Sequence, residues 1–410
     1  MQANKPVLSI CVPSRNRQFY FQATIKALTG SVRSDVEFVF VDNSDDPWIM
    51  DSFIAPYLAD PRIRYVRTGE TIRSMLDNWQ TAMNETTGRW VTFIGDDDHA
   101  DPDIAGVILK IEAAKPDVEA IDWAKLFYSW PDGEAAATGQ GVPLGTEIHD
   151  VPHSLLKDRA FRWKDATHVI VSGFSIYHGA VSRPLIERIS ARYDGRFFEF
   201  PVVDYESVFK IIMNGRNFAH CSRPLSVLGV CPLSNSAALK DLKDQEKKQD
   251  EFDRELDKPV DQLPCFTDFP FKSRFGVIAC IGMAHHWFAD RQGVTFSGYE
   301  ENFVRACQAQ CNGIPKREDY DLTTARYRAA FAKWKRGKFQ KLFRPHYSEP
   351  VNTIAFSGVH KNQLYVSADN EPSRTCAGYY DLVSAALTPV NELEANIGQF
   401  TVAEDLRRRA

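Results

Sequence analysis

The chain has 410 residues, of which 44% are hydrophobic and 25% are charged, with a formal net charge of −5. This composition is typical of a folded globular protein and excludes a mainly disordered chain. The acidic balance argues against nucleic acid as a partner, because binding phosphates requires a positive surface. No apolar run reaches the length of about 20 residues that spans a bilayer, and the start, MQANKPVLSICVPSRN, lacks the pattern of a signal peptide.

The first hundred residues alternate between strand and helix patterns. Short apolar or β-rich runs predict strands over residues 7–13, 37–44, 63–69 and 90–95, and apolar residues at helical spacing predict helices over 19–30 and 71–88. Strands that alternate with helices favour a parallel sheet covered on both faces. We therefore expect an α/β fold with a mostly parallel central sheet flanked by helices.

An acidic run, Asp96 to Asp98 in FIGDDDHADP, directly follows the fourth predicted strand. Adjacent carboxylates repel one another, so the run is either a solvated turn before the next helix or part of a site with a positive partner. Polar residues also follow the first two strands, in SRNR and DNSDD. Because loops converge beyond the carboxyl ends of parallel strands, three such ends favour a site.

The residue types at these strand ends fit a nucleotide diphosphate. Paired carboxylates are oxygen ligands for Mg²⁺ or Mn²⁺, which usually keeps bonds to a substrate diphosphate. Asp42 can accept a hydrogen bond from a base or a ribose, while Arg15, Arg17 and Arg73 can pair with phosphates.

The order of these motifs resembles that of family 2 glycosyltransferases with the GT-A fold, which is Rossmann-like. VPSRNR (12–17), VFVDNSDD (39–46) and IGDDDHADP (94–102) look like the opening, the second strand end and the D-x-D metal motif of that family. The stretch 75–98 is similar to a bacterial cell-surface polysaccharide branch. The likeness covers roughly residues 6–237, and the remainder has no counterpart that we identify.

The resemblance implies transfer of a sugar from a nucleotide-diphosphate donor to a hydroxyl acceptor, with inversion, by a hexosyltransferase-type enzyme. It also implies a Mg²⁺ or Mn²⁺ ion that acts as a Lewis acid on the leaving diphosphate. It makes Asp96 and Asp98 the metal ligands, although three consecutive acids leave open which two bind. The residues implied to contact the nucleotide are Pro13, Arg15, Asp42, Arg73 and Asp97.

Asp204 is our candidate for the general base. An inverting transfer needs a carboxylate on the acceptor side, and the acids of the first hundred residues are assigned to the nucleotide and the metal. Asp204 follows an apolar stretch and opens a predicted helix in PVVDYESVFKIIMNG. Asp204 could instead be the cap of that helix, with Glu206 as the base.

The chain divides into a catalytic part and a C-terminal part at the charge-dense segment 240–256. We expect residues 1–239 to form the GT-A domain, with a nucleotide-binding half (1–102) and an acceptor half (103–239), and residues 240–410 to be mostly helical. Two other functions stay open: a nucleotidyltransferase that makes sugar nucleotides, and a non-catalytic sugar-binding or nucleotide-binding protein. VPSRNR lacks the Gly-rich phosphate loop that the first would need, and the intact acidic motif argues against the second.

The segment 326–344 interleaves eight Lys and Arg residues with five aromatic residues. Such a helix either lies on an anionic membrane, which would suit a lipid-linked saccharide acceptor, or packs its aromatic residues against the protein. We therefore predict a cytoplasmic protein that can contact the inner face of the membrane. The eight scattered cysteines predict reduced thiols.

Four further assignments are left open by the sequence. His178 either touches the acceptor or is a buried structural residue, and Trp79 beside Asn78 either faces the donor or packs in the core. Ser234 and Asn235 are either part of a loop over the diphosphate or ordinary turn residues. Cys280 with His285 and His286 could be imagined as a zinc site but lacks a second ligand pair.

Overall fold

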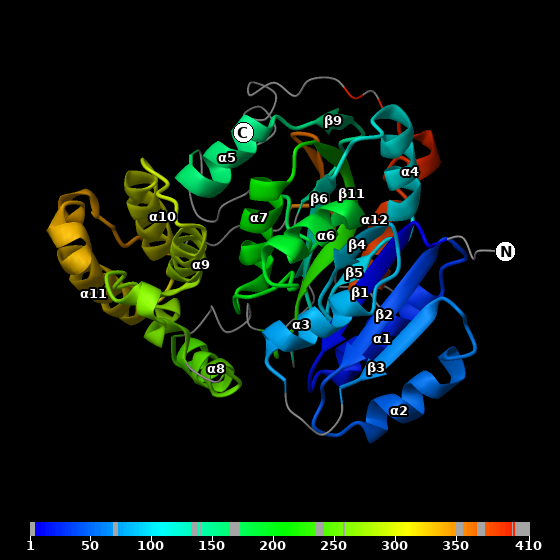
Figure 1. The fold of residues 1–410 in the computed structure, drawn as a ribbon, viewed down its shortest axis with the longest axis horizontal. Helices are drawn as coiled ribbons and strands as arrows, with labels where there is room; N and C mark the ends of the chain where they lie inside the picture. Colours follow the sequence, from blue (N-terminus) through cyan, green and yellow to red (C-terminus); the bar gives the residue numbers. More distant parts are fainter. Residues whose placement is uncertain are drawn as a thin grey trace.

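A computed structural model describes residues 5–68, 73–132, 138–139, 141–164, 173–234, 242–256, 259–349, 356–366, 374–395 and 397. Its centre is a ten-stranded mixed sheet with the strand order β3-β2-β1-β4-β10-β6-β11-β5, to which β7 and β9 are added at the side (Figure 1). The strands of this sheet are β1 (Leu8–Ser14), β2 (Val36–Asp42), β3 (Ile63–Arg67), β4 (Trp90–Phe93), β5 (His99–Ala100), β6 (Ala120–Ser129), β7 (Thr138–Gly139), β9 (Ile148–Asp150), β10 (Gly179–Ser182) and β11 (Phe218–Val230).

The helices fall into two groups along the chain. Those that accompany the large sheet are α1 (Gln18–Thr29), α2 (Trp48–Ile54), α3 (Met75–Asn84), α4 (Ile104–Ala114), α5 (His153–Arg162), α6 (Arg183–Arg192) and α7 (Val203–Asn214). Those that follow are α8 (Leu242–Arg254), α9 (Val277–Gln292), α10 (Glu300–Asn312), α11 (Arg317–Lys333) and α12 (Cys376–Ser384). A small second sheet is formed by β12 (Gly358–His360), β13 (Gln363–Tyr365) and β8 (Val142–Pro143).

The predicted parallel arrangement of the first four strands is confirmed. β1 pairs in parallel with both β2 and β4, and β2 pairs in parallel with β3. Alternate residues of β1 enter two different cores: Leu8, Ile10 and Val12 pack with α1, α2 and α4, whereas Cys11 packs with α3, α6 and α7. The strand is therefore buried on both faces, which explains its continuous apolar sequence.

Helix α3 begins later than predicted, at Met75 rather than at residue 71. Its cap is Ser74, whose Oγ accepts a hydrogen bond from the backbone N–H of Asp77 at 3.2 Å. Ser is a preferred capping residue, because its side chain satisfies an N–H that has no partner inside the helix.

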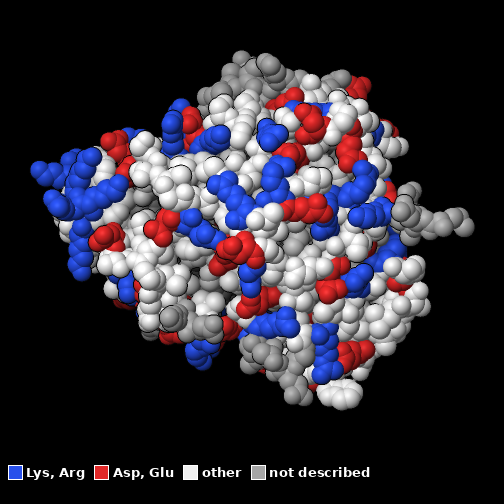
Figure 2. Space-filling view, in the orientation of Figure 1, with Lys and Arg blue, Asp and Glu red and all other residues white. Residues whose placement is uncertain are grey.

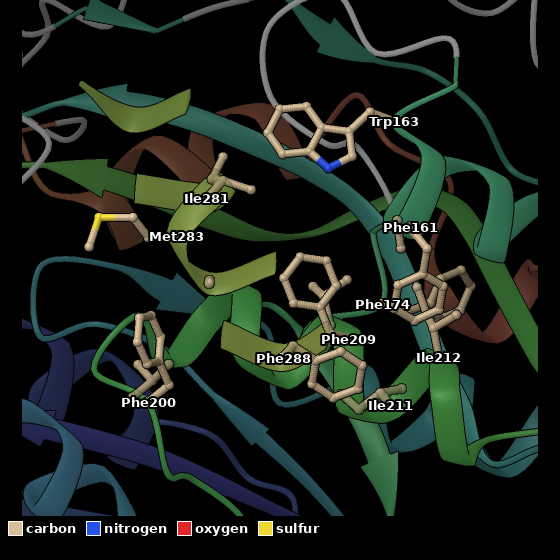
Figure 3. Packing of buried hydrophobic residues seen from close by; sticks show 14 of the residues in the cluster. Phe161, Trp163, Phe174, Phe200, Phe209, Ile211, Ile212, Ile281, Met283 and Phe288 are labelled. Atoms are coloured by element: carbon tan, nitrogen blue, oxygen red, sulfur yellow. The ribbon is translucent and has the colours of Figure 1, made fainter. Parts of the chain in front are cut away.

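The C-terminal helices share one hydrophobic core with the sheet domain. Phe161 at the end of α5 stacks on Phe296 with ring centroids 4.3 Å apart. Phe209 of α7 contacts Phe288 of α9, with ring centroids 5.7 Å apart (Figure 3). Phe200 stacks on Trp287 at 4.9 Å. The boundary that we predicted at residue 239 therefore does not separate two cores in the described structure.

The chain returns to the sheet after α11. Gln363 of β13 pairs with Pro143 of β8, and α12 packs against β11. The side chain of Arg223 donates from Nε to the carbonyl of Thr388 at 2.6 Å. The last described segment thus covers a part of the sheet domain that lies more than 100 residues earlier in the chain.

The segment 326–344 is not one continuous helix. Helix α11 ends at Lys333, and two short 3-10 turns follow at Trp334–Gly337 and Gln340–Leu342. Its five aromatic side chains are buried in the core, so they cannot lie on a membrane: Tyr327, Phe331, Trp334, Phe339 and Phe343. Within the described residues, no helix is long and apolar enough to cross a bilayer.

Candidate active site

The ends of β1, β2 and β4 lie side by side at one edge of the sheet. The N–H of Asn43, just after β2, donates to the carbonyl of Ser14 at 3.0 Å, and the N–H of Ile94, just after β4, donates to the carbonyl of Cys11 at 3.0 Å. The three polar loops that the sequence singles out are therefore neighbours, as we predicted from the parallel pairing.

Asp96 is fully buried and faces Arg17. Its Oδ2 accepts from Ser14 Oγ at 2.6 Å and from Arg17 Nε at 3.1 Å, and its Oδ1 lies 2.7 Å from Arg17 Nη2. Burial raises the pKa of Asp96 to about 7, while the Arg17 guanidinium opposes this rise. Oδ1 has no well-aligned hydrogen-bond donor in the described structure, so this oxygen has capacity for a further partner.

Asp97 points to the same guanidinium from the other side. Arg17 Nη1 lies 3.3 Å from its Oδ1, and the N–H of Cys231 donates to its Oδ2 at 3.1 Å. Burial raises the pKa of Asp97, and Arg17 again acts against the rise. Arg17 thus bridges two of the three carboxylates and reduces the repulsion that makes the run costly on its own.

Asp98 is turned away from Arg17 and is held by four donors. Its Oδ2 accepts from the N–H of Gly95 at 2.6 Å, from Tyr177 Oη at 2.7 Å and from His178 Nε2 at 2.9 Å, and its Oδ1 accepts from the N–H of Gly229 at 2.6 Å. Burial disfavours the ionised form, but His178, Tyr177 and Gly229 together outweigh it and lower the pKa of Asp98. Both oxygens are therefore occupied by the protein.

The hydrogen bonds around His178 indicate its tautomer. Trp123 Nε1 donates to Ser226 Oγ at 2.8 Å, so the hydroxyl proton of Ser226 is free to point at His178 Nδ1, also 2.8 Å away. Nδ1 then accepts and Nε2 carries the proton that Asp98 receives. His178 also adopts a left-handed backbone with φ of 55°, a conformation that is uncommon for residues other than glycine. The structure thus favours the structural reading of this histidine.

Glycine at position 229 allows β11 to lie against the acidic loop. A Cβ atom there would lie 1.9 Å from the carbonyl oxygen of Asp97, which no real side chain tolerates. The same carbonyl accepts from Trp130 Nε1 at 2.8 Å and from Cys376 Sγ at 3.0 Å. The loop is fixed by β6, β11 and α12 together.

Among the predicted nucleotide contacts, Pro13 is buried within β1 and Arg15, in the loop that follows, is half-buried. Arg15 forms ion pairs with Asp45 at 3.5 Å and, more closely, with Glu255 from the C-terminal part of the chain. Asp42 is buried at the end of β2, where its oxygens accept from Tyr65 Oη at 3.1 Å and from the N–H of Ser44 at 3.0 Å. Burial raises the pKa of Asp42.

Arg73 lies beside the end of β2. Its carbonyl accepts from Asn43 Nδ2 at 2.7 Å, and its guanidinium donates from Nη1 to Thr81 Oγ1 at 2.7 Å. Asn43 therefore links the loop after β2 to Arg73, which directly precedes the cap residue of α3. The structure brings Arg15, Arg17, Asp42 and Arg73 to one edge of the sheet.

Asp204 is the second residue of α7 and is partly buried. The cap position belongs to Val202, so Asp204 is not the N-cap that we considered as its alternative role. Its Oδ1 accepts from the N–H of Tyr205 at 2.9 Å, and burial raises its pKa to about 6. The charge of Asp204 is also one of those that raise the pKa of Tyr177, which donates to Asp98. Ser175 Oγ donates to the carbonyl of Asp204 at 3.0 Å, which joins the start of α7 to the segment that carries Tyr177.

Glu206 lies two residues after Asp204 in α7 but has a different environment. Its carboxylate is fully buried, accepts from the N–H groups of Glu199 at 2.8 Å and Phe200 at 2.9 Å, and lies 2.7 Å from Lys210 Nζ. These contacts hold the loop before α7. A carboxylate so enclosed cannot reach an acceptor hydroxyl, which argues against Glu206 as the substitute base.

The structure gives partners within the protein to the described residues of the other open assignments. Trp79 stacks on Phe93 at 4.9 Å, and the Nδ2 of Asn78 donates to the carbonyl of Ser14 at 3.3 Å. His285 and His286 each interact with a backbone carbonyl, not with Cys280. Ser234 donates to the carbonyl of Cys231 at 2.8 Å. Asn235 lies outside the described residues.

Sequence reasoning missed most of the partners of the acidic loop. Tyr177, Gly229, Cys231 and Cys376 lie 79 to 279 residues later in the chain, so their contacts with the loop are not local. The stretch IYHG, which contains both Tyr177 and His178, was the signal available for this group.

The described residues fit a divalent ion only in part. No group of three His, Cys, Asp or Glu side chains among them is arranged as a metal site. Asp98 does not fit, because a metal would have to displace its four donors. Asp96 and Asp97 fit better, since Asp96 Oδ1 lacks an aligned donor and one or two carboxylates suffice for Mg²⁺ when phosphates and waters complete the shell.

Comparison with known proteins now assigns the sheet domain. Residues 9–183 match the family model described as glycosyl transferase family 2. The chain contains a family 2 glycosyltransferase domain. This match confirms the predicted family and the prediction of a glycosyltransferase. No curated protein matches the chain.

Solved structures show weak similarity to this glycosyltransferase. TarS 1-349 of S. aureus, solved in complex with UDP-GlcNAc, has 13% identity and a TM-score of 0.44, over 82% of this chain and 89% of that one. The mannosyltransferase PcManGT of Pyrobaculum calidifontis, solved with GDP-Man and Mn²⁺, has 15% identity and a TM-score of 0.37, over 83% and 86%.

Proposed function

We propose that this glycosyltransferase transfers a sugar from a nucleotide-diphosphate donor to a hydroxyl group of a saccharide or lipid-linked saccharide acceptor, with inversion. The observation that carries the proposal is the meeting of Arg17 with Asp96 and Asp97 at the ends of β1 and β4, inside the family 2 domain. An acidic loop with a paired arginine at this edge of an α/β sheet suits a phosphate-bearing ligand.

The donor would lie across the ends of β1, β2 and β4. Asp42 would accept from the base or the ribose, while Arg15 and Arg73 would pair with the diphosphate. Pro13 would shape the floor of the site, and Asp97 would contact the nucleotide. The ion pairs of Arg15 support a role in anion binding, because this side chain already holds two carboxylates at the protein surface.

A Mg²⁺ or Mn²⁺ ion would be held by Asp96 and Asp97, in place of the Asp96 and Asp98 pair that the family motif implies. When bound, such an ion supplies Lewis-acid stabilisation of the leaving diphosphate. The saturated hydrogen bonds of Asp98 support this change of assignment. Asp98 would instead fix the shape of the loop that carries the other two acids.

Asp204 would act as the general base. In the transfer step the acceptor oxygen forms a bond to the anomeric carbon, the bond from that carbon to the diphosphate breaks, and the acceptor proton moves to the carboxylate of Asp204. The raised pKa of Asp204, about 6, supports this role, because a base with a pKa close to the working pH is both ionised and basic. The hydrogen bond from Ser175 Oγ to the carbonyl of Asp204 supports it further, because it joins the start of α7 to the segment that carries Tyr177, a donor to Asp98.

The acceptor would belong to a bacterial surface polysaccharide or glycoconjugate. This part of the proposal is supported by the resemblance of residues 75–98 to that branch of the family.

Calorimetric titration with UDP and GDP, each with and without Mn²⁺, tests the donor site. We expect one nucleotide to bind the wild type more tightly with Mn²⁺, and the metal-dependent gain to be lost in Asp96→Asn. Asp290→Asn is the matched control, because Asp290 is exposed on the distant helix α9. Equal affinity in wild type and Asp96→Asn, whether or not metal is present, would contradict the proposed site.

A further inference from the structure

The outer end of the helical lobe carries a large excess of positive charge. No acidic residue occurs between Leu322 and Ser348, whereas the stretch 326–344 alone contains eight Lys and Arg residues. The whole chain has a net charge of −5, so this end differs in sign from the rest of the molecule. Sugar transfer at the edge of the sheet does not account for it.

Six of these cations form a surface that we call the basic tip: Arg328, Lys333, Arg336, Lys338, Lys341 and Arg344. All six are exposed, and none has an ion-pair partner among the described residues. The other two are paired, Arg326 with Glu246 and Lys335 with Glu300. Figure 2 shows Lys and Arg side chains gathered over the protruding end of α11. The basic tip is therefore an unneutralised positive surface.

The buried aromatic side chains set the direction of these charges. The rings of Phe331 and Trp334 contact Phe271 at 4.9 Å and 5.3 Å, inside the core. With the aromatic faces fixed inward, the long cationic side chains on the opposite face are left in solvent. Leu342, 49% exposed, is the one large apolar side chain among the exposed positions described in 326–344.

The backbone at the basic tip is held in an unusual conformation. Lys335 and Arg336 have φ of 47° and 56°, and Gly337 follows with φ of 75°. Each left-handed L-residue is disfavoured, and such backbone tends to occur where function requires it. Because of this turn, Trp334 is buried while the next two residues, Lys335 and Arg336, are exposed. Cationic side chains therefore lie at the surface both before and after the turn.

We propose that the basic tip is a docking surface for an anionic phospholipid membrane. A lipid surface requires only a field of positive charge on a protruding part of the protein, which is what the six unpaired cations provide. Single-stranded nucleic acid, the main rival polyanion, is bound with exposed aromatic rings on which bases stack, and here all five rings are buried. The contact is electrostatic, without insertion of the aromatic residues into the bilayer.

The strength of the contact follows from the number of cations. Each Lys or Arg near an anionic surface contributes about a fivefold increase in the partition coefficient. Neutralising three of them should therefore lower it by about 100-fold. Because the Debye length is about 10 Å at 0.1 M salt, raising the salt should also weaken the contact.

Vesicle co-sedimentation tests the proposal on the full chain. We would compare neutral phosphatidylcholine vesicles with vesicles that contain phosphatidylglycerol, at low and high salt. The test variant is Arg336→Gln/Lys338→Gln/Lys341→Gln, and Arg336→Glu/Lys338→Glu/Lys341→Glu is a stronger second variant. The matched control is Lys26→Gln/Lys157→Gln/Lys247→Gln, whose three positions are exposed on other helices. All substituted side chains are at the surface, so we expect every variant to fold. Thermal unfolding of each variant checks this.

We expect the wild type and the control to bind anionic vesicles only, with salt sensitivity, and the test variant to bind about 100-fold more weakly. Equal binding to neutral and anionic vesicles, or an unchanged affinity of the test variant, would overturn the proposal. Binding to single-stranded RNA in place of vesicles, lost in the same variant, would overturn it in favour of nucleic acid. Displacement from vesicles by inorganic phosphate beyond the effect of equal ionic strength would point to a site for free phosphate instead.

Discussion

Asp204 and Glu206 show how two carboxylates in one helical turn can take different roles. Burial raises the pKa of both, to about 6 for Asp204 and about 7 for Glu206. Glu206, however, is fully enclosed by two N–H groups and the Lys210 ammonium, whereas Asp204 is partly exposed and its Oδ1 accepts from the N–H of Tyr205. The partly exposed carboxylate is the one that can exchange a proton with a substrate.

The first prediction concerns Asp204→Asn. We expect turnover to fall by about 10²- to 10⁴-fold with nucleotide affinity unchanged, because the variant lacks a proton acceptor. In the wild type, kcat/KM should rise with pH through about 6, as the base becomes ionised. Steady-state kinetics over the pH range would check both, and a variant with near-normal turnover would remove Asp204 from the mechanism.

The stability of the same variant distinguishes a base from a structural residue. The folded-state pKa of Asp204 is raised, so the free energy of unfolding that it contributes is present at low pH and is lost as pH rises through about 6. Asn carries no charge to bury, so Asp204→Asn should be more stable than wild type at pH 8, by about 1 kcal/mol, and similar at pH 4. A loss of stability at pH 8 in urea denaturation would indicate a structural role.

The second prediction separates the three adjacent acids. Asp98→Asn should lower the free energy of unfolding by about 3 kcal/mol, because an amide cannot accept from all of Gly95, Tyr177, His178 and Gly229. Asp96→Asn should cost less, since Arg17 and Ser14 can still bond to one oxygen. Urea denaturation of both variants would check this order. Asp98→Asn with wild-type stability would show that the four bonds contribute little, and would leave Asp98 free to bind metal.

At the scale of the element, α7 is positioned from its buried side. Lys210 Nζ is fully buried and lies 2.7 Å from Glu206 and 2.9 Å from Glu199, with the carbonyl of Phe197 at 2.9 Å. The ammonium also lies over the ring of Tyr193 at 4.1 Å. This network joins the loop 197–200 to the first turns of α7, and so fixes the helix start from which Asp204 projects.

The third prediction therefore concerns Glu206→Gln. Breaking a buried ion pair leaves the Lys210 charge with less compensation, and we expect the free energy of unfolding to drop by about 3 kcal/mol. The double variant Glu206→Gln/Lys210→Met removes the unpaired charge and should recover part of the loss. Denaturation of both, together with wild type, forms the measurement. If the double variant is no more stable than Glu206→Gln, the charge of Lys210 is not the cause.

At the scale of the whole molecule, the C-terminal part is a structural partner of the catalytic domain. Its helices α9 to α11 enter the same core as α5 and α7, and α12 supports the acidic loop through Cys376 and the carbonyl of Asp97. Helix α8 is followed by Glu255, which pairs with Arg15 at the edge of the sheet. Glu255, from the C-terminal part, thus forms an ion pair with Arg15, the side chain that we propose binds the donor diphosphate.

The fourth prediction follows from that contact. Glu255→Gln should increase the affinity for the preferred nucleotide diphosphate about fivefold, because the donor no longer competes with a carboxylate for Arg15. Glu251→Gln, on the adjoining turn of α8, is the control. Calorimetric titration gives the comparison, with Arg15→Ala as a reference for the loss of the cation. An affinity that stays the same in Glu255→Gln but falls in Arg15→Ala would show that Glu255 does not compete.

By itself the sequence determined the first four strands of the sheet and the edge at which their polar ends meet. The strand patterns before residue 100 and the polar residues at their ends are local features, and parallel pairing brings such ends together. The predicted strands β1 to β4 and the gathering of Arg15, Asp42, Arg73 and Asp96 at one edge follow from this. The family match over residues 9–183 agrees with the motifs in that range.

The tertiary structure alone decided which partners each of the three acids has and where the C-terminal part of the chain packs. Asp96, Asp97 and Asp98 are three consecutive residues of the same type. Packing places Asp98 beside Tyr177, His178 and Gly229. It places Asp96 and Asp97 beside Arg17. These partners come from distant elements, so no local pattern encodes them. The aromatic residues of 326–344 likewise fit a membrane or a core equally well by periodicity, and the apolar surface offered by residues 269–275 and α10 placed them inside.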